Sequence, residues 1–268
     1  MNTVGFAYLN IENNRRDEIL DDLSTAGFHS VLYDLFSLRS PFGFRDNIDN
    51  RVFDQLKLLV WLENIIAAFK DQERIAISDF KVWPNNHFNA VEIATNLPSE
   101  YRQYDPKAAF WIFLLEKVGI VRSIDGQWFL SKAAKATLGD RKALLQMLIE
   151  GIGFRINWSV LDGKSAKETG QLAFGTSLIL LHKYGNEFRD VMFYTNKYFQ
   201  FFELAREETP IENEQSEVDF IEVYIYRTFY CFAQMFDFVE IKETKSQDGI
   251  TTQIQTTSLF RSLFEFRM

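Results

Sequence analysis

The sequence is short of the residues that cross-link or interrupt a chain. Its 268 residues include one cysteine, five prolines and 13 glycines. A single cysteine excludes a disulfide within the chain, which favours a reducing compartment or indifference to redox conditions. Few prolines and glycines, with 47% hydrophobic and 25% charged residues, are typical of a compact folded chain and exclude a disordered one.

Long hydrophobic runs are also missing. No apolar stretch approaches the roughly 20 residues of a membrane span, so we expect no membrane partner. The first residues, MNTVGFAYLNIENNRRDEIL, lack a basic leader followed by an apolar run, so we expect no signal peptide. We therefore expect a cytoplasmic location.

The usual signatures of catalysis and metal binding are absent from the sequence. His29, His87 and His182 lie far apart and form no HxH or HExxH pattern, and no GxGxxG, P-loop or GxSxG motif occurs. Cys231 lies in the aromatic run YIYRTFYCFAQMF, where a buried structural thiol is the natural interpretation. We expect no catalytic residue, no metal site and no cofactor. The chain is then not an enzyme, and no small-molecule ligand can be inferred.

The sequence is rich in aromatic residues, and its charge is unevenly distributed. Aromatics reach 16%, and 27 residues are phenylalanine, which raises the expectation of a protein interface or a homo-oligomer. The net charge of −8 disfavours a nonspecific nucleic-acid binder. Residues 107–142, however, carry seven basic and three acidic residues, whereas residues 207–249 carry three basic and eleven acidic ones. The two halves therefore present different electrostatic faces.

The stretch from Asp105 to Leu138 has the clearest secondary-structure signals in the chain. Pro106 follows an aspartate and opens an apolar helix, which Gly119 ends. Two short apolar runs then flank Asp125-Gly126, a strong hairpin signal, and a further helix follows. The pattern predicts helix, hairpin and helix in immediate succession.

A second copy of this pattern occurs near the end of the chain. Residues 236–239 correspond to residues 118–121, and Asp248-Gly249 repeats the turn. Residues 254–264 align with residues 128–138 without a gap. The copies are about 118 residues apart before the hairpin and about 126 after it, because the second hairpin is longer.

The passage LEKVGIVRSIDGQWFLS resembles the helix-to-hairpin passage of the winged-helix superfamily, which includes both DNA readers and protein-binding modules. The segments RIAISDF, LEKVGIV and LSKAAKATLGD follow one another in the chain. They make it similar, from Arg51 onward, to the C-terminal region of uncharacterised bacterial proteins of the plasmid ORF-3-like type. These resemblances imply a fold and no activity. We expect a mostly α fold with small β wings, in which two winged-helix-like units pack with intervening aromatic-rich helices.

Four segments follow from this reading. Residues 1–50 form a poorly defined N-terminal segment, in which SLRSPFGFRDNIDN has the composition of a loop. Residues 51–150 hold a helix up to Lys70 and the first winged-helix-like unit, ending with a helix that stops at Gly151. Residues 151–206 form a helical connector, interrupted at Gly185. Residues 207–268 begin with the charged linker EETPIENEQSE and form the second unit.

The candidate functional residues lie in the first unit. Apolar Phe110, Trp111, Phe113 and Leu114 occupy much of the face that a DNA reader would expose, so they are candidates for an interface or for packing on neighbouring helices. Arg122, Lys132 and Lys135 are candidates for nucleic-acid contact, although an ordinary solvated surface explains them as well. The first hypothesis is a non-catalytic protein-interaction or scaffold protein whose winged-helix units are packing surfaces. The alternative is a DNA-binding transcriptional regulator that uses the basic first unit.

Overall fold

The computed structural model describes residues 25–70, 72–79, 84, 96–101, 103–164, 169–172, 174–201, 214–246 and 249–267. Helices account for 55% of it and strands for 17%, the latter in three small antiparallel sheets. The expectation of a mostly α protein is therefore wrong, and the fold is mixed α and β. It was wrong because several strands are only two or three residues long, too short for an alternating pattern to show.

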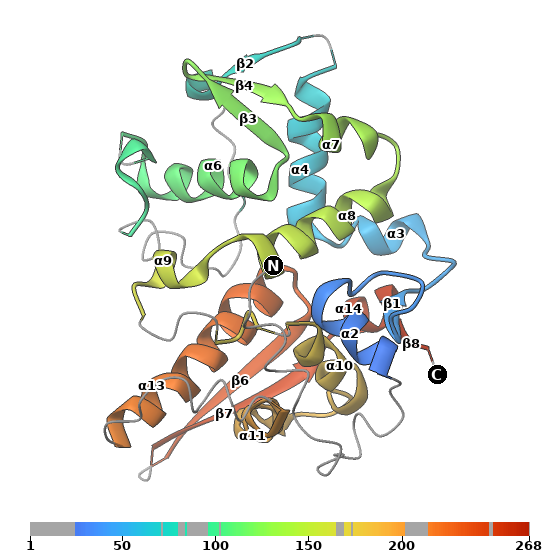
Figure 1. The fold of residues 1–268 in the computed structure, drawn as a ribbon, viewed down its shortest axis with the longest axis vertical. Helices are drawn as coiled ribbons and strands as arrows, with labels where there is room; N and C mark the ends of the chain where they lie inside the picture. Colours follow the sequence, from blue (N-terminus) through green and yellow to red (C-terminus); the bar gives the residue numbers. More distant parts are fainter. Residues whose placement is uncertain are drawn as a thin grey trace.

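The first hairpin unit lies at one end of the molecule (Figure 1). Asp105 caps its long helix by accepting hydrogen bonds from the backbone N–H groups of Lys107 and Ala108, and Gly119, at φ 87°, ends it. Both features agree with the sequence. The unit consists of α4 (Lys57–Ala68), β2 (Ile75–Ala76), α6 (Pro106–Val118), β3 (Val121–Ile124), β4 (Gln127–Leu130) and α7 (Lys132–Ala136).

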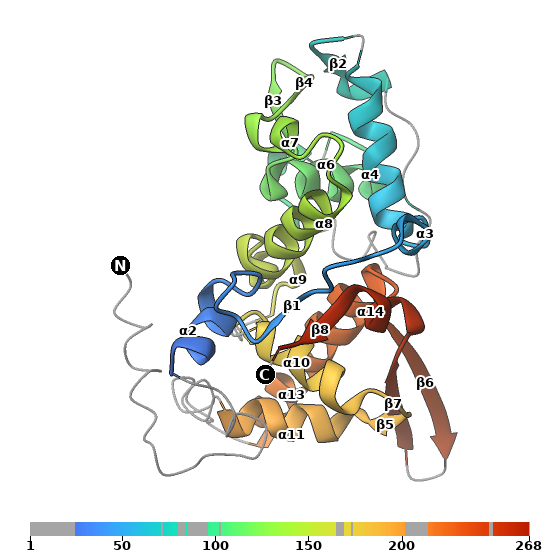
Figure 2. The same cartoon turned by 90° about the vertical axis from the view of Figure 1, so that its right-hand side faces the viewer.

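The second hairpin unit lies at the other end and repeats this order of elements, with one further helix (Val191–Phe201) after its first strand in the part of the chain that the structure describes (Figures 1 and 2). Its central helix begins as an α-helix and continues as a π-helix, which the sequence did not predict. The unit consists of α10 (Phe174–Tyr184), β5 (Arg189–Asp190), α11 (Val191–Phe201), α13 (Glu214–Ile225), the π-helix η4 (Tyr226–Ala233), β6 (Val239–Ser246), β7 (Gly249–Thr256) and α14 (Ser258–Leu263).

Each unit contains the same hydrogen bond at the positions where the two sequence copies align. In each, a left-handed residue ends the central helix, and its carbonyl accepts a hydrogen bond from the hydroxyl that caps the following helix. The equivalent bonds are Ser131 Oγ to Gly119 O, 2.6 Å, and Thr257 Oγ1 to Asp237 O, 2.8 Å. The repeat is therefore structural as well as sequential.

A third strand joins each hairpin in the same register. Ile75 of β2 pairs with Trp128 of β4, and Arg189 of β5 pairs with Ile254 of β7. Trp128 and Ile254 occupy equivalent positions, so the strand orders β2-β4-β3 and β5-β7-β6 match as well. Neither two-residue strand was predicted.

A two-stranded sheet connects the N-terminal segment to the end of the chain. β1 (Phe42–Phe44) pairs antiparallel with β8 (Phe264–Phe266), and the backbone N–H of Arg267 donates to Pro41 O. Phe42–Phe44 lies in the stretch predicted as a loop. That prediction was wrong here. Pro41 and Gly43 gave the loop signal, but the phenylalanines beside them are buried and form a strand.

The remaining elements connect these parts. The helix predicted up to Lys70 is broken after Phe53, and Gly151 does not end the helix before it, because a π-helix follows. The charged linker was predicted to run to residue 217, but α13 begins at Glu214; residues 202–213 lie outside the described residues. The elements are α2 (Thr25–Tyr33), α3 (Asn50–Phe53), the short helices η1 (Ile77–Asp79) and η2 (Ser99–Tyr101), α8 (Arg141–Glu150), the π-helix η3 (Gly151–Arg155) and α9 (Trp158–Asp162).

The core is continuous between the two units. One cluster of buried apolar side chains runs from Val31 to Phe264. Arg227 of η4 and Asp162 of α9 form a buried two-pronged ion pair, with Nε–Oδ2 at 2.6 Å and Nη2–Oδ1 at 2.9 Å. Among the described residues, no helix combines the length and apolar character needed to cross a membrane.

Candidate functional site

The apolar candidates on α6 lie in the core of the protein. Phe110, Trp111 and Leu114 have no exposed area, and Phe113 is 4% exposed. Trp111 packs on Trp61 of α4 with ring centroids 5.2 Å apart. In this structure these four side chains therefore pack on the chain's own helices, and none offers area to a partner.

The central helix of the second unit is covered in the same way. Six of the eight side chains of η4 are buried, among them Arg227 and Cys231. Tyr230 is half-buried, and its hydroxyl donates to Glu243 at 2.5 Å. Burial and this hydrogen bond raise the pKa of Tyr230 to about 12. Most side chains of α6 and of η4 are therefore turned into the protein.

The basic candidates of the first unit are exposed, but they come from two separate elements. Arg122 extends from β3, and its guanidinium lies 5.5 Å from the centroid of the Phe129 ring on β4. Lys132 and Lys135 extend from α7, one turn apart. The equivalent positions of the second unit hold Glu240, Ser258 and Arg261, so only one of the three positive charges recurs.

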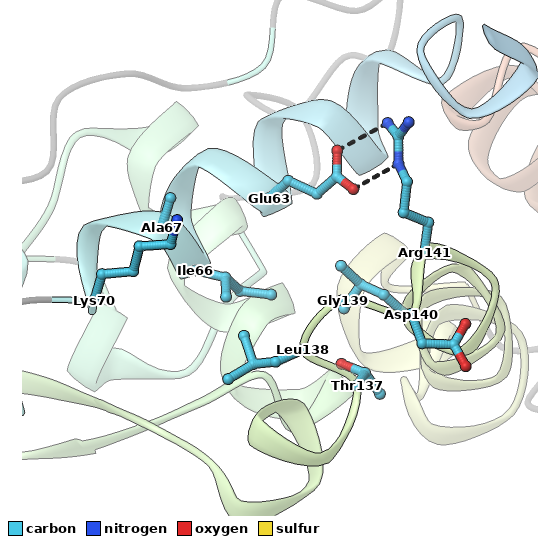
Figure 3. A pocket seen from close by; sticks show the side chains of 10 residues that line it. Glu63, Ile66, Ala67, Lys70, Thr137, Leu138, Gly139, Asp140 and Arg141 are labelled. Carbon is cyan, nitrogen blue, oxygen red and sulfur yellow. Dashed lines mark hydrogen bonds and ion pairs between the residues drawn. The ribbon is translucent and has the colours of Figure 1, made fainter. Parts of the chain in front are cut away.

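A cleft opens where α7 turns into α8 (Figure 3). We call it the Leu138 cleft, because Leu138 is 58% exposed at its edge while Ile66 and Leu144 at its floor are buried. Gly139, at φ 82°, makes the turn, and Asp140 caps α8 by accepting from Ala143 N–H. The lining residues are Glu63, Ile66, Ala67, Lys70, Thr137, Leu138, Gly139, Asp140, Arg141 and Leu144.

Arg141 closes one side of the Leu138 cleft. Its guanidinium forms two contacts with the Glu63 carboxylate, at 2.7 and 2.9 Å, and one with Asp54 at 2.7 Å (Figure 3 shows the Glu63 pair). Partial burial alone would lower the pKa of Arg141, but the hydrogen bonds and negative charges of Asp54 and Glu63 raise it overall. Arg141 therefore stays charged and ties α8 to α3 and α4.

The size of the Leu138 cleft limits what it can hold. Its volume is about 220 Å³. Small-molecule sites usually measure about 300–1,000 Å³, whereas an apolar cavity of about 150 Å³ is enough for benzene. The cleft therefore fits one large apolar side chain better than a cofactor.

The structure gives the histidines no common site. His182 is half-buried, His29 is exposed, and His87 lies outside the described residues. Over the part of the chain that the structure describes, no three or more His, Cys, Asp or Glu side chains are placed to hold a metal ion.

Sequence reasoning missed the Leu138 cleft. The break between two helices at Gly139-Asp140 is visible in the sequence as a turn signal. The exposure of Leu138 is not visible, because it depends on how far α4 stands from α8.

Comparisons with protein-family models, with curated proteins and with solved structures found no match. The resemblances to winged-helix and plasmid ORF-3-like proteins therefore stay predictions.

Proposed function

We propose that the protein is a non-catalytic interaction or scaffold protein in which two winged-helix-like units act as packing units. The observation that carries this proposal is the burial of α6 and η4. A helix that reads DNA must present polar side chains to the edges of the bases. Most side chains of α6 and of η4 are instead buried in the core of the protein itself.

The surfaces left to a partner are then the hairpins and the helices that follow them. Exposed apolar side chains occur on both hairpin units: Ile124 and Leu138 on the first, and Met192 and Ile250 on the second. Single exposed apolar side chains are common on soluble proteins, so position and neighbours must identify the one that binds.

Titrations of labelled DNA duplexes of different sequence, with a random-sequence duplex beside them, test this proposal. We expect no sequence-preferring complex in fluorescence anisotropy at low ionic strength, where phosphate contacts are strongest. Binding that discriminates between duplex sequences and survives physiological salt would contradict it, because such binding needs base readout.

A second candidate function is contact with a nucleic-acid backbone through Arg122, Lys132 and Lys135. The observation that favours it is the exposure of all three in a chain that is otherwise acidic. This candidate predicts duplex binding that is weak, salt-sensitive and independent of sequence in the same titrations. Arg122→Glu, which installs the residue of the second unit, should weaken that binding, whereas Lys242→Glu on β6 should not. Absence of any binding at low salt would exclude this candidate.

A further inference from the structure

Two lysines and the exposed leucine form one stripe beside the cleft. Lys132 and Lys135 are three positions apart on α7, and the N–H of Leu138 donates to Lys135 O, which continues the turn. Side chains three apart on a helix lie on the same face. The stripe therefore places two positive charges on the face of α7 that runs toward Leu138, at the edge of the cleft.

The second hairpin unit shows how the equivalent place is used within the chain. Phe264 is the counterpart of Leu138, yet it has no exposed area. The extended strand β1 covers it: the ring centroids of Phe42 and Phe44 lie 5.1 and 5.0 Å from that of Phe264. In that unit, then, an extended segment bearing phenylalanines occupies the position that is open beside Leu138.

The surroundings of the two places correspond as well. Phe42 also contacts His182 of α10 and Phe260 of α14, at centroid distances of 6.2 and 6.4 Å. It therefore lies between the first and the last helix of its unit. The Leu138 cleft lies between α4 and the end of α7, the corresponding elements of the first unit.

An arginine stands at the same spacing in both places. Arg267, three positions after Phe264, donates to the backbone carbonyl of Phe44 at 2.6 Å and so holds the extended segment. Arg141, three positions after Leu138, lines the cleft.

From this correspondence we propose that the Leu138 cleft binds an extended, acidic segment of a partner protein, with one aromatic or large aliphatic side chain inserted between α4 and α8. The inference rests on the proposed interaction function and names the chemistry of its partner. The apolar floor and the volume of about 220 Å³ suit one such side chain.

Charge specifies the residues on either side of the inserted side chain. The acidic groups at the cleft are already engaged, Glu63 with Arg141 and Asp140 with Ala143 N–H. Lys132 and Lys135 are exposed and face solvent, so acidic residues of the partner complete the stripe. The chain's own Phe42-Gly43-Phe44 segment is followed by Arg45, so a second copy of this chain fits poorly.

A labelled peptide tests the proposal on the full-length protein. The probe is fluorescein-DEFGFDE, with DESGSDE and KKFGFKK as matched peptides. In fluorescence anisotropy we expect saturable binding of the first peptide, with a Kd of about 10 μM to 1 mM, and at least tenfold weaker binding of the other two.

Variants locate the binding site. Leu138→Asp should weaken binding of the probe at least tenfold, and Lys132→Glu with Lys135→Glu should weaken it and remove its salt dependence. The matched control is Ile250→Asp, because Ile250 is 61% exposed on the other hairpin unit, and the charge control is Lys242→Glu with Lys245→Glu. Both controls should leave binding unchanged. Circular dichroism melting checks that each variant is folded.

Three results would overturn the proposal: no saturable binding of the probe, equal binding of DESGSDE, or an unchanged Kd for folded Leu138→Asp. Displacement of the probe by a tighter-binding random DNA duplex would also overturn it and assign the stripe to phosphate. Failure of the peptide alone leaves the proposed function standing, because that function is tested separately by the duplex titration.

Discussion

Two tyrosines one helical turn apart on α11 differ in the hydrogen bonding of their buried hydroxyls. Tyr198 donates to the carbonyl of Leu172 at 2.9 Å and accepts from the N–H of Gly170 at 3.2 Å. Tyr194 is equally buried, but its hydroxyl has no hydrogen-bond partner among the described residues. Burial raises the pKa of Tyr194 to about 12, so the group is neutral at any ordinary pH.

Removing these two hydroxyls should therefore have different effects on stability. Tyr198→Phe leaves a backbone donor and an acceptor unsatisfied, so we expect it to lower the free energy of unfolding by about 1–3 kcal/mol. Tyr194→Phe removes a group that was buried without compensation, so we expect it to be neutral or up to about 1 kcal/mol stabilising. Urea unfolding of the two variants measures the difference. An equal loss in both would show that Tyr194 is hydrogen-bonded in solution.

His182 should make stability depend on pH. Burial, followed by the positive charges of Arg261 and Arg45, lowers its pKa in the folded protein. The unfolded chain then binds the proton more readily, with a pKa near 6.5. The stability that neutral His182 contributes is fully present above about pH 6.5 and is lost as the pH falls through the lower folded-state pKa.

Thermal unfolding between pH 7.5 and 5.5 measures this effect. We expect the Tm of the wild type to fall with pH and that of His182→Gln to fall less. His29→Gln, at an exposed position, is the control and should follow the wild type. Parallel curves for all three proteins would assign the decline to other groups.

At the scale of elements, two glycines of the π-helix η3 permit close packing between the units. A Cβ at Gly151 would lie 2.6 Å from a methyl group of Val118 on α6, and one at Gly153 would lie 2.8 Å from the ring of Phe174 on α10. Both distances are too short for contact between carbon atoms. The two glycines therefore set how closely η3 approaches both hairpin units.

Alanine at either glycine should reverse the usual effect of this substitution. Glycine to alanine in a helix normally stabilises by about 1 kcal/mol. Because the added methyl overlaps α6 or α10, we expect Gly151→Ala and Gly153→Ala each to destabilise by about 1–3 kcal/mol in urea unfolding. Asn196→Ala, at an exposed position of α11, should change stability by no more than about 0.5 kcal/mol. Stabilisation by either glycine variant would show that η3 moves to make room.

Elements with local signals were predictable from the sequence, and elements made by distant contacts were not. The Asp105-Pro106 cap and Gly119 mark the ends of α6, and Asp125-Gly126 marks the first hairpin. The π-helices have no local signature. The strands β2 and β5 exist only because a hairpin lies beside them.

The same distinction applies to the candidate site. The exposure of Arg122, Lys132 and Lys135 follows from their charge. The apolar character of α6 was visible in the sequence, whereas the helices that cover Phe110 and Trp111 were not. The Leu138 cleft required the spacing of α4 and α8, which no local pattern encodes.

At the scale of the whole molecule, the tryptophans leave the second hairpin unit without a fluorescent reporter. All five lie between residues 61 and 158, and none lies in the second hairpin unit. Helical circular dichroism, in contrast, reports on both ends. The two signals therefore measure unfolding of different regions.

Because the buried core is continuous between the units, we expect both signals to change together. Tryptophan fluorescence and far-ultraviolet circular dichroism should show the same urea midpoint within error. As a control, Phe264→Ala in the second unit should shift the fluorescence midpoint too, by the equivalent of about 3–5 kcal/mol. Separate midpoints, or an unmoved fluorescence curve in that variant, would show that the units unfold independently.

The pairing of β1 with β8 has a consequence for how the protein is made. The carbonyl of Phe44 accepts a hydrogen bond from Arg267, which is synthesised 223 residues later. At about 5–20 residues per second, the ribosome needs roughly 11–45 seconds to make that stretch. During this interval three nascent phenylalanines, Phe36, Phe42 and Phe44, lack their partner Phe264. A stop codon just before Phe264 would leave all three permanently without that partner, in a chain that otherwise carries nearly its whole sequence.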